Sequence, residues 1–422
     1  AATNKSMRLH ARKRYGQDDM DVFGFMDRPV PAKQVILRNA GNDRTGALFR
    51  DAVLHRVMDG LHLDVSRSRP VSVFVNGEYW GLFNLRERLG DDHFAAVAGV
   101  KDSDIELSRN YGVTEDQPGM APPWLDLIGR IEAAQVAGRP VWPVAEADMD
   151  LDSYIDLHIA QIYVGNIDWP FNNMLAWRVR PSASVPAKAR AFRKWHWPAN
   201  DMDATFHVSG TLKLSEMLSE QGPRGRPDLA WSNRLFRALM KDPVFRSRFL
   251  QRYVDLLNTQ FAPERVNRFV DQYRADIAGE VPHHINRWRV PADVASWERS
   301  VRHVRNFANQ RMAPQMAEFQ SLFGLADPVS IELGPLGSYA VLRVNGLRHE
   351  ADMSRPVLLR YFKGMALKIE VVEGACRRFQ GWQGQSARGA PLELIVDQPL
   401  VLRPILKPAC EAAAATGPPQ GS

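Results

Sequence analysis

The segment between residues 150 and 206 constrains the fold of this chain more than any other. Its first part, Leu151–Val164, carries isoleucines at intervals of three and four residues, which predicts a helix with one buried stripe. A polar loop at residues 166–173 follows. Next come two apolar runs, which we expect to pair as the strands of a β-hairpin: Met174–Val179 and Phe192–Trp197.

Acidic and amide side chains lie at both ends of this hairpin. Asp168 and Asn173 precede it, and Asp201 and Asp203 follow its second strand. Because a hairpin brings its two ends together, we expect Asn173 to face Asp201. Mg²⁺ takes oxygen ligands and keeps waters, so one or two carboxylates and an amide oxygen suffice beside a phosphate group. The same residues are also typical of ordinary turns after helices, and the spacing alone leaves both interpretations open.

The layout resembles the catalytic half of protein kinases. In that class a first Asp accepts the proton of the attacking hydroxyl, and an Asn and a later Asp hold magnesium ions. Two runs are similar to the paired signature of the CotH kinase family, atypical protein kinases related to spore-coat protein H: Gly165-Asn-Ile-Asp-Trp-Pro-Phe-Asn-Asn-Met-Leu-Ala-Trp-Arg178 and Lys194-Trp-His-Trp-Pro-Ala-Asn-Asp-Met-Asp-Ala-Thr-Phe206. The resemblance implies Asp168 as the base, and Asn173 and Asp201 as metal ligands. It implies that Asp203 binds a second ion or supports Asp201.

Three further residues receive a role from the same resemblance. Lys5 is similar in position to a family lysine that approaches the nucleotide phosphates, and Arg50 to an arginine that faces the site from the start of a helix. Glu87 ends a segment that in the family joins the small lobe to the large one near the nucleotide. From the residues alone, Lys5 is a solvated lysine and Glu87 an edge-strand charge. Asp51, next to Arg50, is a plain complement to the helix dipole.

The rest of the sequence predicts secondary structure and contains no further candidate catalytic residues. Alternating β-branched residues around Asn76-Gly77 predict a hairpin with a two-residue turn. Residues 209–228 are rich in Gly, Ser and Pro, and we expect a loop near the site. Residues 231–323 have helical periodicity. Within them we interpret His283 and His284 as structural, because adjacent histidines lack the i, i+4 placement of a helical zinc pair.

The pattern of apolar and polar residues changes near the end of the chain. Short alternating segments at residues 329–408, separated by Gly, Asn and Pro, predict a small antiparallel β module. Its run Arg378-Phe-Gln-Gly-Trp-Gln-Gly384 resembles the divergent internalin B-type repeat of bacterial surface and secreted proteins, which implies a secreted or cell-envelope location and makes Trp382 a core anchor. We expect the tail at residues 409–422, rich in Ala, Gly and Pro, to be disordered.

The composition of the chain limits the classes of protein to which it can belong. The 422 residues, 45% hydrophobic and 24% charged, suit a globular chain with more than one core. The net charge of +6 comes from dispersed arginines, so we expect no nucleic-acid partner. The sequence contains no run of about 18 apolar residues, so we expect no membrane-spanning helix. Cys376 and Cys410 exclude a disulfide framework and a cysteine-built zinc site, and allow one bridge in an oxidising compartment. Because the chain opens on Ala1 without an apolar signal core, we expect upstream residues to have been removed or left out.

The expected fold is α+β: an atypical bilobal protein-kinase-like domain at residues 1–325, followed by the β module. Its small β-rich lobe covers about residues 1–94, and its large helical lobe about residues 95–325. The resemblance implies transfer of the ATP γ-phosphoryl group to Ser or Thr of a protein substrate with Mg²⁺ or Mn²⁺. The sequence indicates neither the acceptor protein nor the oligomeric state.

Two alternatives stay open. The first is a catalytically inert adhesion or scaffold protein of the same fold. It is suggested by Ala199-Asn200, where the family carries a Pro-Trp-like pair, and by family N-terminal strands that the given sequence lacks. The second is a metal-dependent phosphohydrolase, which the single acidic cluster disfavours because two-ion hydrolases need more carboxylates.

Overall fold

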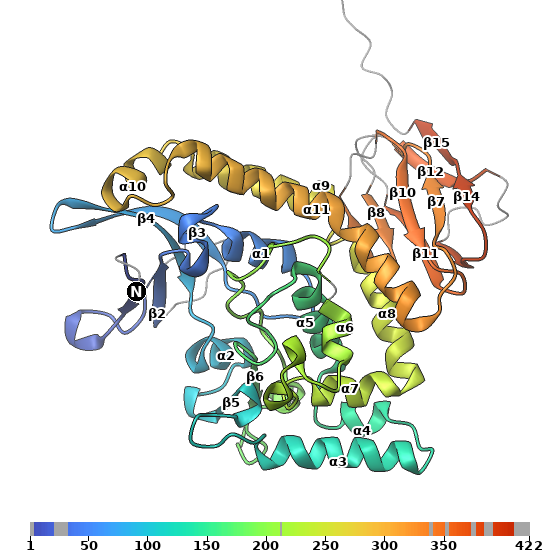
Figure 1. Ribbon diagram of the computed structural model, residues 1–422, viewed down its shortest axis with the longest axis horizontal. Helices are drawn as coiled ribbons and strands as arrows, with labels where there is room; N and C mark the ends of the chain where they lie inside the picture. Colours follow the sequence, from blue (N-terminus) through green and yellow to red (C-terminus); the bar gives the residue numbers. More distant parts are fainter. Residues whose placement is uncertain are drawn as a thin grey trace, which may run out of the picture. The chain divides into compact units, whose positions relative to one another are not determined.

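The computed structural model describes residues 4–20, 33–211, 213–336, 341–350, 354–372, 377–383 and 391–408. The chain forms two compact units (Figure 1). Unit 1 contains Ala1–Arg252 and Val266–Leu322, and unit 2 contains Tyr253–Arg265 and Phe323–Ser422. Helices and strands occur in both, which confirms the α+β class.

Unit 1 opens with a four-stranded antiparallel sheet in the order β1-β2-β4-β3. Its strands are β1 (Met7–His10), β2 (Gln34–Arg38), β3 (Ser68–Val75) and β4 (Glu78–Glu87). Asn76 and Gly77 join β3 to β4 with φ angles of 51° and 83°, the left-handed values that a type I′ turn requires. The hairpin predicted from Asn-Gly is confirmed.

One helix packs along this sheet. In α10 (Val281–Trp288), the buried His284 accepts a 3.0 Å hydrogen bond at Nδ1 from the backbone N–H of Leu82 in β4. Nε1 of Trp288 donates to the carbonyl of Trp80, also in β4, and Figure 1 shows α10 running beside this strand. His284 is therefore structural, as predicted.

The helical part of unit 1 surrounds α5 (Leu151–Val164), which has the predicted bounds. Thirteen of its side chains are buried, so it is a central helix rather than an amphipathic surface one. The other elements of this part, with the helices that continue into unit 2, are α1 (Arg50–Met58), α2 (Asp91–Ala98), α3 (Pro122–Val136), α4 (Trp142–Glu146), α6 (Lys213–Leu218), α7 (Arg234–Lys241), α8 (Pro243–Asn258), α9 (Pro263–Ile277), α11 (Val294–Phe323), β5 (Ile105–Arg109) and β6 (Leu175–Val179). Short 3₁₀ helices are η1 (Lys13–Tyr15), η2 (Gly41–Thr45), η3 (Asp102–Asp104), η4 (Asn110–Gly112), η5 (Ala187–Arg193), η6 (Pro223–Gly225) and η7 (Pro227–Leu229).

The predicted hairpin after α5 is only partly present. The first strand, β6, pairs along its length with β5. The expected second strand begins in η5 and meets β6 at one antiparallel bridge, between Trp177 and His196. Neighbouring backbone groups bond elsewhere: Trp195 exchanges hydrogen bonds with residues 148 and 150, and the N–H of Trp197 donates to Oγ of Ser153. Because Trp177 and His196 exchange both of their backbone hydrogen bonds, the backbone groups of residues 195 and 197 point away from β6, toward the start of α5. The next residue that would donate to β6 is Pro198, which has no N–H, so the pairing does not continue in that direction.

Unit 2 is mostly β-structure, as predicted for this region. Its strands are β7 (Val329–Leu333), β8 (Val341–Val344), β9 (Leu347–His349), β10 (Val357–Tyr361), β11 (Ala366–Val372), β12 (Arg377–Trp382), β13 (Leu392–Ile395), β14 (Leu400–Leu402) and β15 (Pro404–Pro408). They form the sheets β10-β7-β14, β13-β11-β8-β9 and β12-β15. The pairing is antiparallel except between β14 and β7, which are parallel. Trp382 is 2% exposed, as expected of a core anchor.

The end of α8 belongs to unit 2 because its polar side chains bond to the strands. Asn258 exchanges hydrogen bonds of 2.8 and 2.9 Å with the backbone of Arg360. The carboxylate of Asp255 accepts from the hydroxyl of Tyr361 at 2.8 Å and from the amide of Asn345 at 2.7 Å. The tail at residues 409–422 and both cysteines lie outside the described residues.

Among the helices that the structure describes, none has the length and apolarity needed to cross a membrane.

Candidate active site

The loop after α5 and the acidic segment after residue 200 lie side by side. The backbone N–H of Asp168 donates to Oδ1 of Asn166 at 3.0 Å. Nδ2 of the same buried Asn166 donates to the carbonyl of Asp201 at 3.4 Å. The side chain of Asn200 donates to the carbonyl of Asn173 at 3.1 Å. Asp168, Asn173 and Asp201 are therefore held in one region by two asparagine side chains.

Unusual backbone conformations mark the same region. Asn173, Asp201 and Phe206 have φ angles of 63°, 47° and 58°, in the left-handed region that Asn and Asp tolerate and Phe disfavours. The N–H of Phe206 donates to the carbonyl of Val164, and that of Ile167 to the carbonyl of Ala204, both at 3.1 Å. Such conformations persist only where surrounding contacts over-determine them, and they concentrate at functional sites.

A buried arginine fixes the end of α5, where this loop begins. Arg311 is 0% exposed and donates to the carbonyls of Ile162 and Tyr163 at 2.8 and 2.7 Å. It also donates to the carbonyl of Thr211 at 2.7 Å. The last carbonyls of a helix need partners and carry partial negative charge, so this guanidinium both caps α5 and neutralises its end.

The two aspartates after residue 200 differ in their surroundings. Asp203 is buried, and Asn42 donates to both of its oxygens, from its backbone N–H at 3.0 Å and from its side chain at 2.9 Å. Nη2 of Arg38 donates to Asp203 at 2.7 Å and also contacts Oδ1 of Asp201. The side chain of Asp201 is 35% exposed. Desolvation and the nearby charge of Asp203 raise the pKa of Asp201, while Arg38 opposes both effects.

Behind these aspartates lies a buried charge network. Oδ1 of Asp51 accepts a 2.7 Å hydrogen bond from the backbone N–H of Met202, and Oδ2 pairs with Arg86. Nη2 of Arg86 lies 2.7 Å from Nε2 of His55. Burial lowers the pKa of Arg86 to about 9 and that of His55 to about 3. Asp51 thus does more than complement a helix dipole. The sequence signal for its role in this network is the i, i+4 spacing of Asp51 and His55, which places both side chains on one face of the helix.

Arg50 lies next to the acidic segment. Its Nη1 donates to the carbonyl of Thr205 at 3.1 Å, and its Nε lies 3.0 Å from Oδ1 of Asp43. Its side chain is mostly buried and directed at the residues that follow Asp203.

Lys5 and Glu87 lie away from these contacts. Lys5 is exposed, and its neighbour Ser6 donates from Oγ to the side chain of Asn39 at 2.9 Å. Glu87 accepts a 3.0 Å hydrogen bond from the backbone N–H of Arg67. It also lines a cavity of about 220 Å³ where β2 and β4 meet α2.

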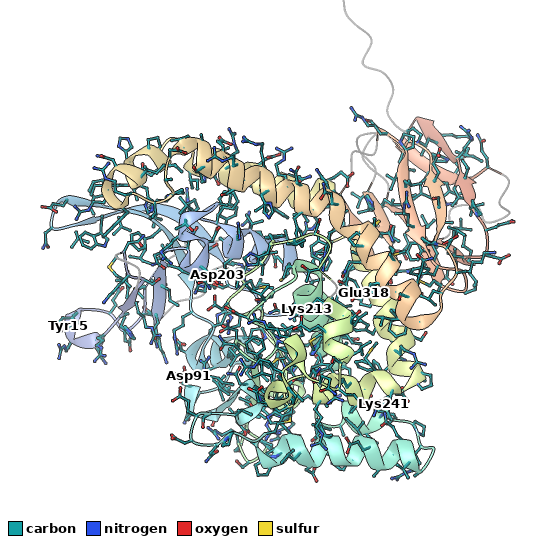
Figure 2. The ribbon with its side chains drawn as sticks, viewed as in Figure 1. Tyr15, Asp91, Asp203, Lys213, Lys241 and Glu318 are labelled. Atoms are coloured by element: carbon teal, nitrogen blue, oxygen red, sulfur yellow. The ribbon has the colours of Figure 1, made fainter. Side chains whose placement is uncertain are left out.

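Lys213 is a further cation, besides Arg38, Arg86 and Arg311, that the sequence did not single out. Lys213 in α6 is 2% exposed and pairs with Glu216 at 3.0 Å. Burial lowers its pKa, and Asp168 is among the charges that oppose this shift. Figure 2 labels it to one side of Asp203 in the middle of unit 1. The predicted loop at residues 209–228 is instead partly helical, and its Arg224 lies 4.8 Å from the ring centroid of Phe171, so the segment does adjoin the loop after α5.

Asp201, Asn173 and Asp203 do not by themselves form a complete protein site for a metal ion. Among the described residues no group of three or more His, Cys, Asp or Glu side chains is arranged to hold a metal ion. Mg²⁺, however, is commonly held by one or two carboxylates together with substrate phosphates. The carboxylate of Asp201 is partly exposed and pairs with Arg38. Asn173 lies near this segment, since its backbone carbonyl accepts a hydrogen bond from the side chain of Asn200. Asp203 fits a supporting role better, because both of its oxygens already accept hydrogen bonds.

An antiparallel four-stranded sheet, a helical part built around α5, and an acidic loop between them define a protein-kinase-like α+β protein. A model of the family described as CotH kinase protein matches residues 2–314 of the 422. The chain therefore belongs to the CotH kinase family. A comparison with curated proteins finds no match.

Proposed function

We propose that this protein transfers the γ-phosphoryl group of ATP to a serine or threonine hydroxyl of a protein substrate, with Mg²⁺ or Mn²⁺. Membership of the CotH kinase family supports transferase chemistry. The observation that carries the finer proposal is the link through Asn166, which joins the loop of Asp168 to the segment of Asp201. A base and a metal ligand must be close neighbours for in-line phosphoryl transfer.

Each proposed role follows from a side chain's surroundings. Asp168 is partly exposed, so an acceptor hydroxyl can reach it and lose its proton there. Asp201 and Asn173 would hold the cation, which when bound supplies positive charge to the phosphoryl oxygens. Asp203 would keep Asp201 in place through Arg38.

The proposed nucleotide contacts come from the small sheet and α1. Arg50 would stabilise the acidic segment beside the phosphates, as its bond to Thr205 indicates. Lys5, exposed two residues before β1 begins, would neutralise phosphate charge. Glu87 would contact the nucleotide from the cavity between the sheet and α2.

The test measures transfer of labelled γ-phosphate from ATP to a serine-rich acceptor protein with Mg²⁺ or Mn²⁺ present. We expect transfer by the natural sequence and loss of transfer in Asp201→Asn, with an ATP-dependent rise in melting temperature that this variant also loses. Label appearing only as inorganic phosphate would instead identify a phosphohydrolase.

A second candidate function is a non-catalytic scaffold. One observation favours it: Arg38 already pairs with Asp201 and Asp203, so the acidic pair is partly neutralised without a metal ion. This candidate predicts neither phosphoryl transfer nor any change in melting temperature with ATP and Mg²⁺.

We also propose the division of the chain into a kinase domain at residues 1–325, a β module at residues 329–408 and a tail. The secreted or cell-envelope location remains a proposal based on the repeat-like run at residues 378–384. Detection of the natural protein in the medium or envelope fraction of its host would support that location.

A further inference from the structure

Arg38 contacts more of the acidic site than its proposed link between Asp203 and Asp201 requires. It is the last residue of β2, and its side chain is 22% exposed. Nη2 contacts Asp201 and Asp203 together, and Nε lies 3.7 Å from Oδ2 of Asp51. One guanidinium thus faces three carboxylates at the proposed cation site.

The three carboxylates depend on Arg38 to different degrees. Asp203 has both oxygens bonded to Asn42, and Asp51 has Arg86 and the N–H of Met202. Within the described part of the chain, the side-chain hydrogen bond of Asp201 comes from Arg38. Asp201 is also the most accessible of the three, with 35% of its side chain exposed against 5% for the others. A cation arriving from solvent therefore competes with Arg38 at Asp201.

The charge balance favours that exchange. Three carboxylates face two guanidinium groups, those of Arg38 and Arg86, which leaves one net negative charge. A divalent cation at Asp201 reverses the sign of this balance and repels Arg38 from that carboxylate. The guanidinium keeps its bond to Asp203 and has other N–H groups to donate. Guanidinium groups bind phosphate oxygens with two parallel hydrogen bonds, which suits the ligand that arrives with the cation.

We propose that Arg38 is a phosphate-binding residue that pairs with Asp201 before the cation arrives and then donates to the nucleotide phosphates. This inference rests on the proposed function, since it assumes that a nucleotide and a divalent cation share this site. It assigns Arg38 opposite effects on two ligands: it weakens binding of the cation alone and strengthens binding of the cation with ATP.

The experiment measures two dissociation constants in Arg38→Gln. The first is for Mn²⁺ alone, from the electron paramagnetic resonance signal of free Mn²⁺. The second is for ATP at saturating Mn²⁺, from calorimetry at a temperature where turnover is negligible. We expect Mn²⁺ alone to bind several-fold tighter, because a competing positive charge is gone. We expect ATP to bind about tenfold weaker, because a charge-assisted contact to phosphate is lost.

Two further variants keep the test informative. Arg38→Lys retains the charge and loses the planar fork, so it should bind Mn²⁺ as the natural sequence does and bind ATP with intermediate affinity. It also serves if Arg38→Gln does not fold. Arg178→Gln is the matched control, since Arg178 is likewise a strand arginine, 16% exposed, in an ion pair of 2.9 Å with Glu106. It should change neither constant.

Two results would overturn the inference. If Arg38→Gln weakens both ligands in parallel, Arg38 only maintains the shape of the site. If it changes neither, Arg38 takes no part in binding. Failure of the proposed function looks different: the natural sequence would then bind no ATP, while the Mn²⁺ measurement would still show whether Arg38 competes with a cation.

Discussion

Asp51 and Arg86 form an ion pair in which the two side chains are only 5% and 8% exposed. The second oxygen of Asp51 accepts the backbone N–H of Met202, which lies between the two aspartates of the site. One carboxylate therefore ties α1, β4 and the acidic segment together. A buried charge that loses its partner is costly, so this pair is expected to dominate the stability of the region.

Asp51→Asn should lower the free energy of unfolding by about 3 kcal/mol, because Arg86 would lose a buried partner. Urea denaturation at pH 7 measures the change. Asp91→Asn is the matched control: Asp91 also lies in the first turn of a helix, but its side chain is 53% exposed. It should cost less than about 0.5 kcal/mol. Equal effects would show that Asp51 acts only on the helix dipole.

Asp168→Asn should reduce phosphoryl transfer by about 10² to 10⁴-fold, because an amide cannot accept the proton of the acceptor hydroxyl. Its melting temperature should stay close to that of the natural sequence, since the side chain is partly exposed. Asp152→Asn changes an exposed carboxylate in the first turn of α5 and should retain full transfer. Retained transfer in Asp168→Asn would remove Asp168 from the mechanism.

Gly41→Ala should disturb the site directly. A Cβ at Gly41 would collide with Oδ2 of Asp203, and the φ of 58° is unfavourable for alanine. Gly138→Ala is a close control, because Gly138 has a φ of 62° and open space where the Cβ would lie. Both variants should lose about 1 kcal/mol of stability from backbone strain. Only Gly41→Ala should also lose phosphoryl transfer. Comparable transfer in the two variants would mean that the position of Asp203 does not matter.

Stability should fall as the pH drops below about 6.5, because buried histidines stay neutral in the folded protein. Burial lowers the pKa of His158 to about 3. Between pH 6.5 and 3 the unfolded chain binds a proton at His158 that the folded protein does not. The free energy of unfolding therefore decreases with falling pH, by up to about 1.4 kcal/mol per pH unit for one histidine.

His158→Phe tests this dependence, since the ring stacks on Phe236 with a centroid distance of 4.6 Å. Urea denaturation between pH 5 and 6.5 should give a shallower dependence in this variant. Between pH 7.5 and 8.5 the difference between the two proteins should be constant, because the histidine is neutral in both states. Identical slopes in the acid range would show that His158 is protonated in the folded protein.

The sequence by itself determined those helices and turns that form because of the residues within them. The bounds of α5 and the turn at Asn76-Gly77 depend on periodicity and dihedral preference, and both appear as predicted. The single buried stripe expected of α5 was wrong, because neighbouring elements bury this helix on nearly all sides. Recognition of the CotH kinase family also came from contiguous motifs. The regular hairpin after α5 did not form: its second strand meets β6 at the Trp177–His196 bridge, and Pro198, which lacks an N–H, cannot donate at the next bonding position. The bonds that residues 195 and 197 make to residues 148, 150 and 153 are contacts with a distant element, which local pattern does not encode.

Only the tertiary structure determined which charged and polar groups pair with one another. Arg38 and Asp201 are 163 positions apart, and Asp51 and Met202 are 151 apart, so no spacing rule connects them. Lys213, which no sequence motif marked, is buried, and its charge interacts with that of Asp168. The strength of a charge pair depends on how far the surrounding residues exclude water from it, and this is set only when the chain folds.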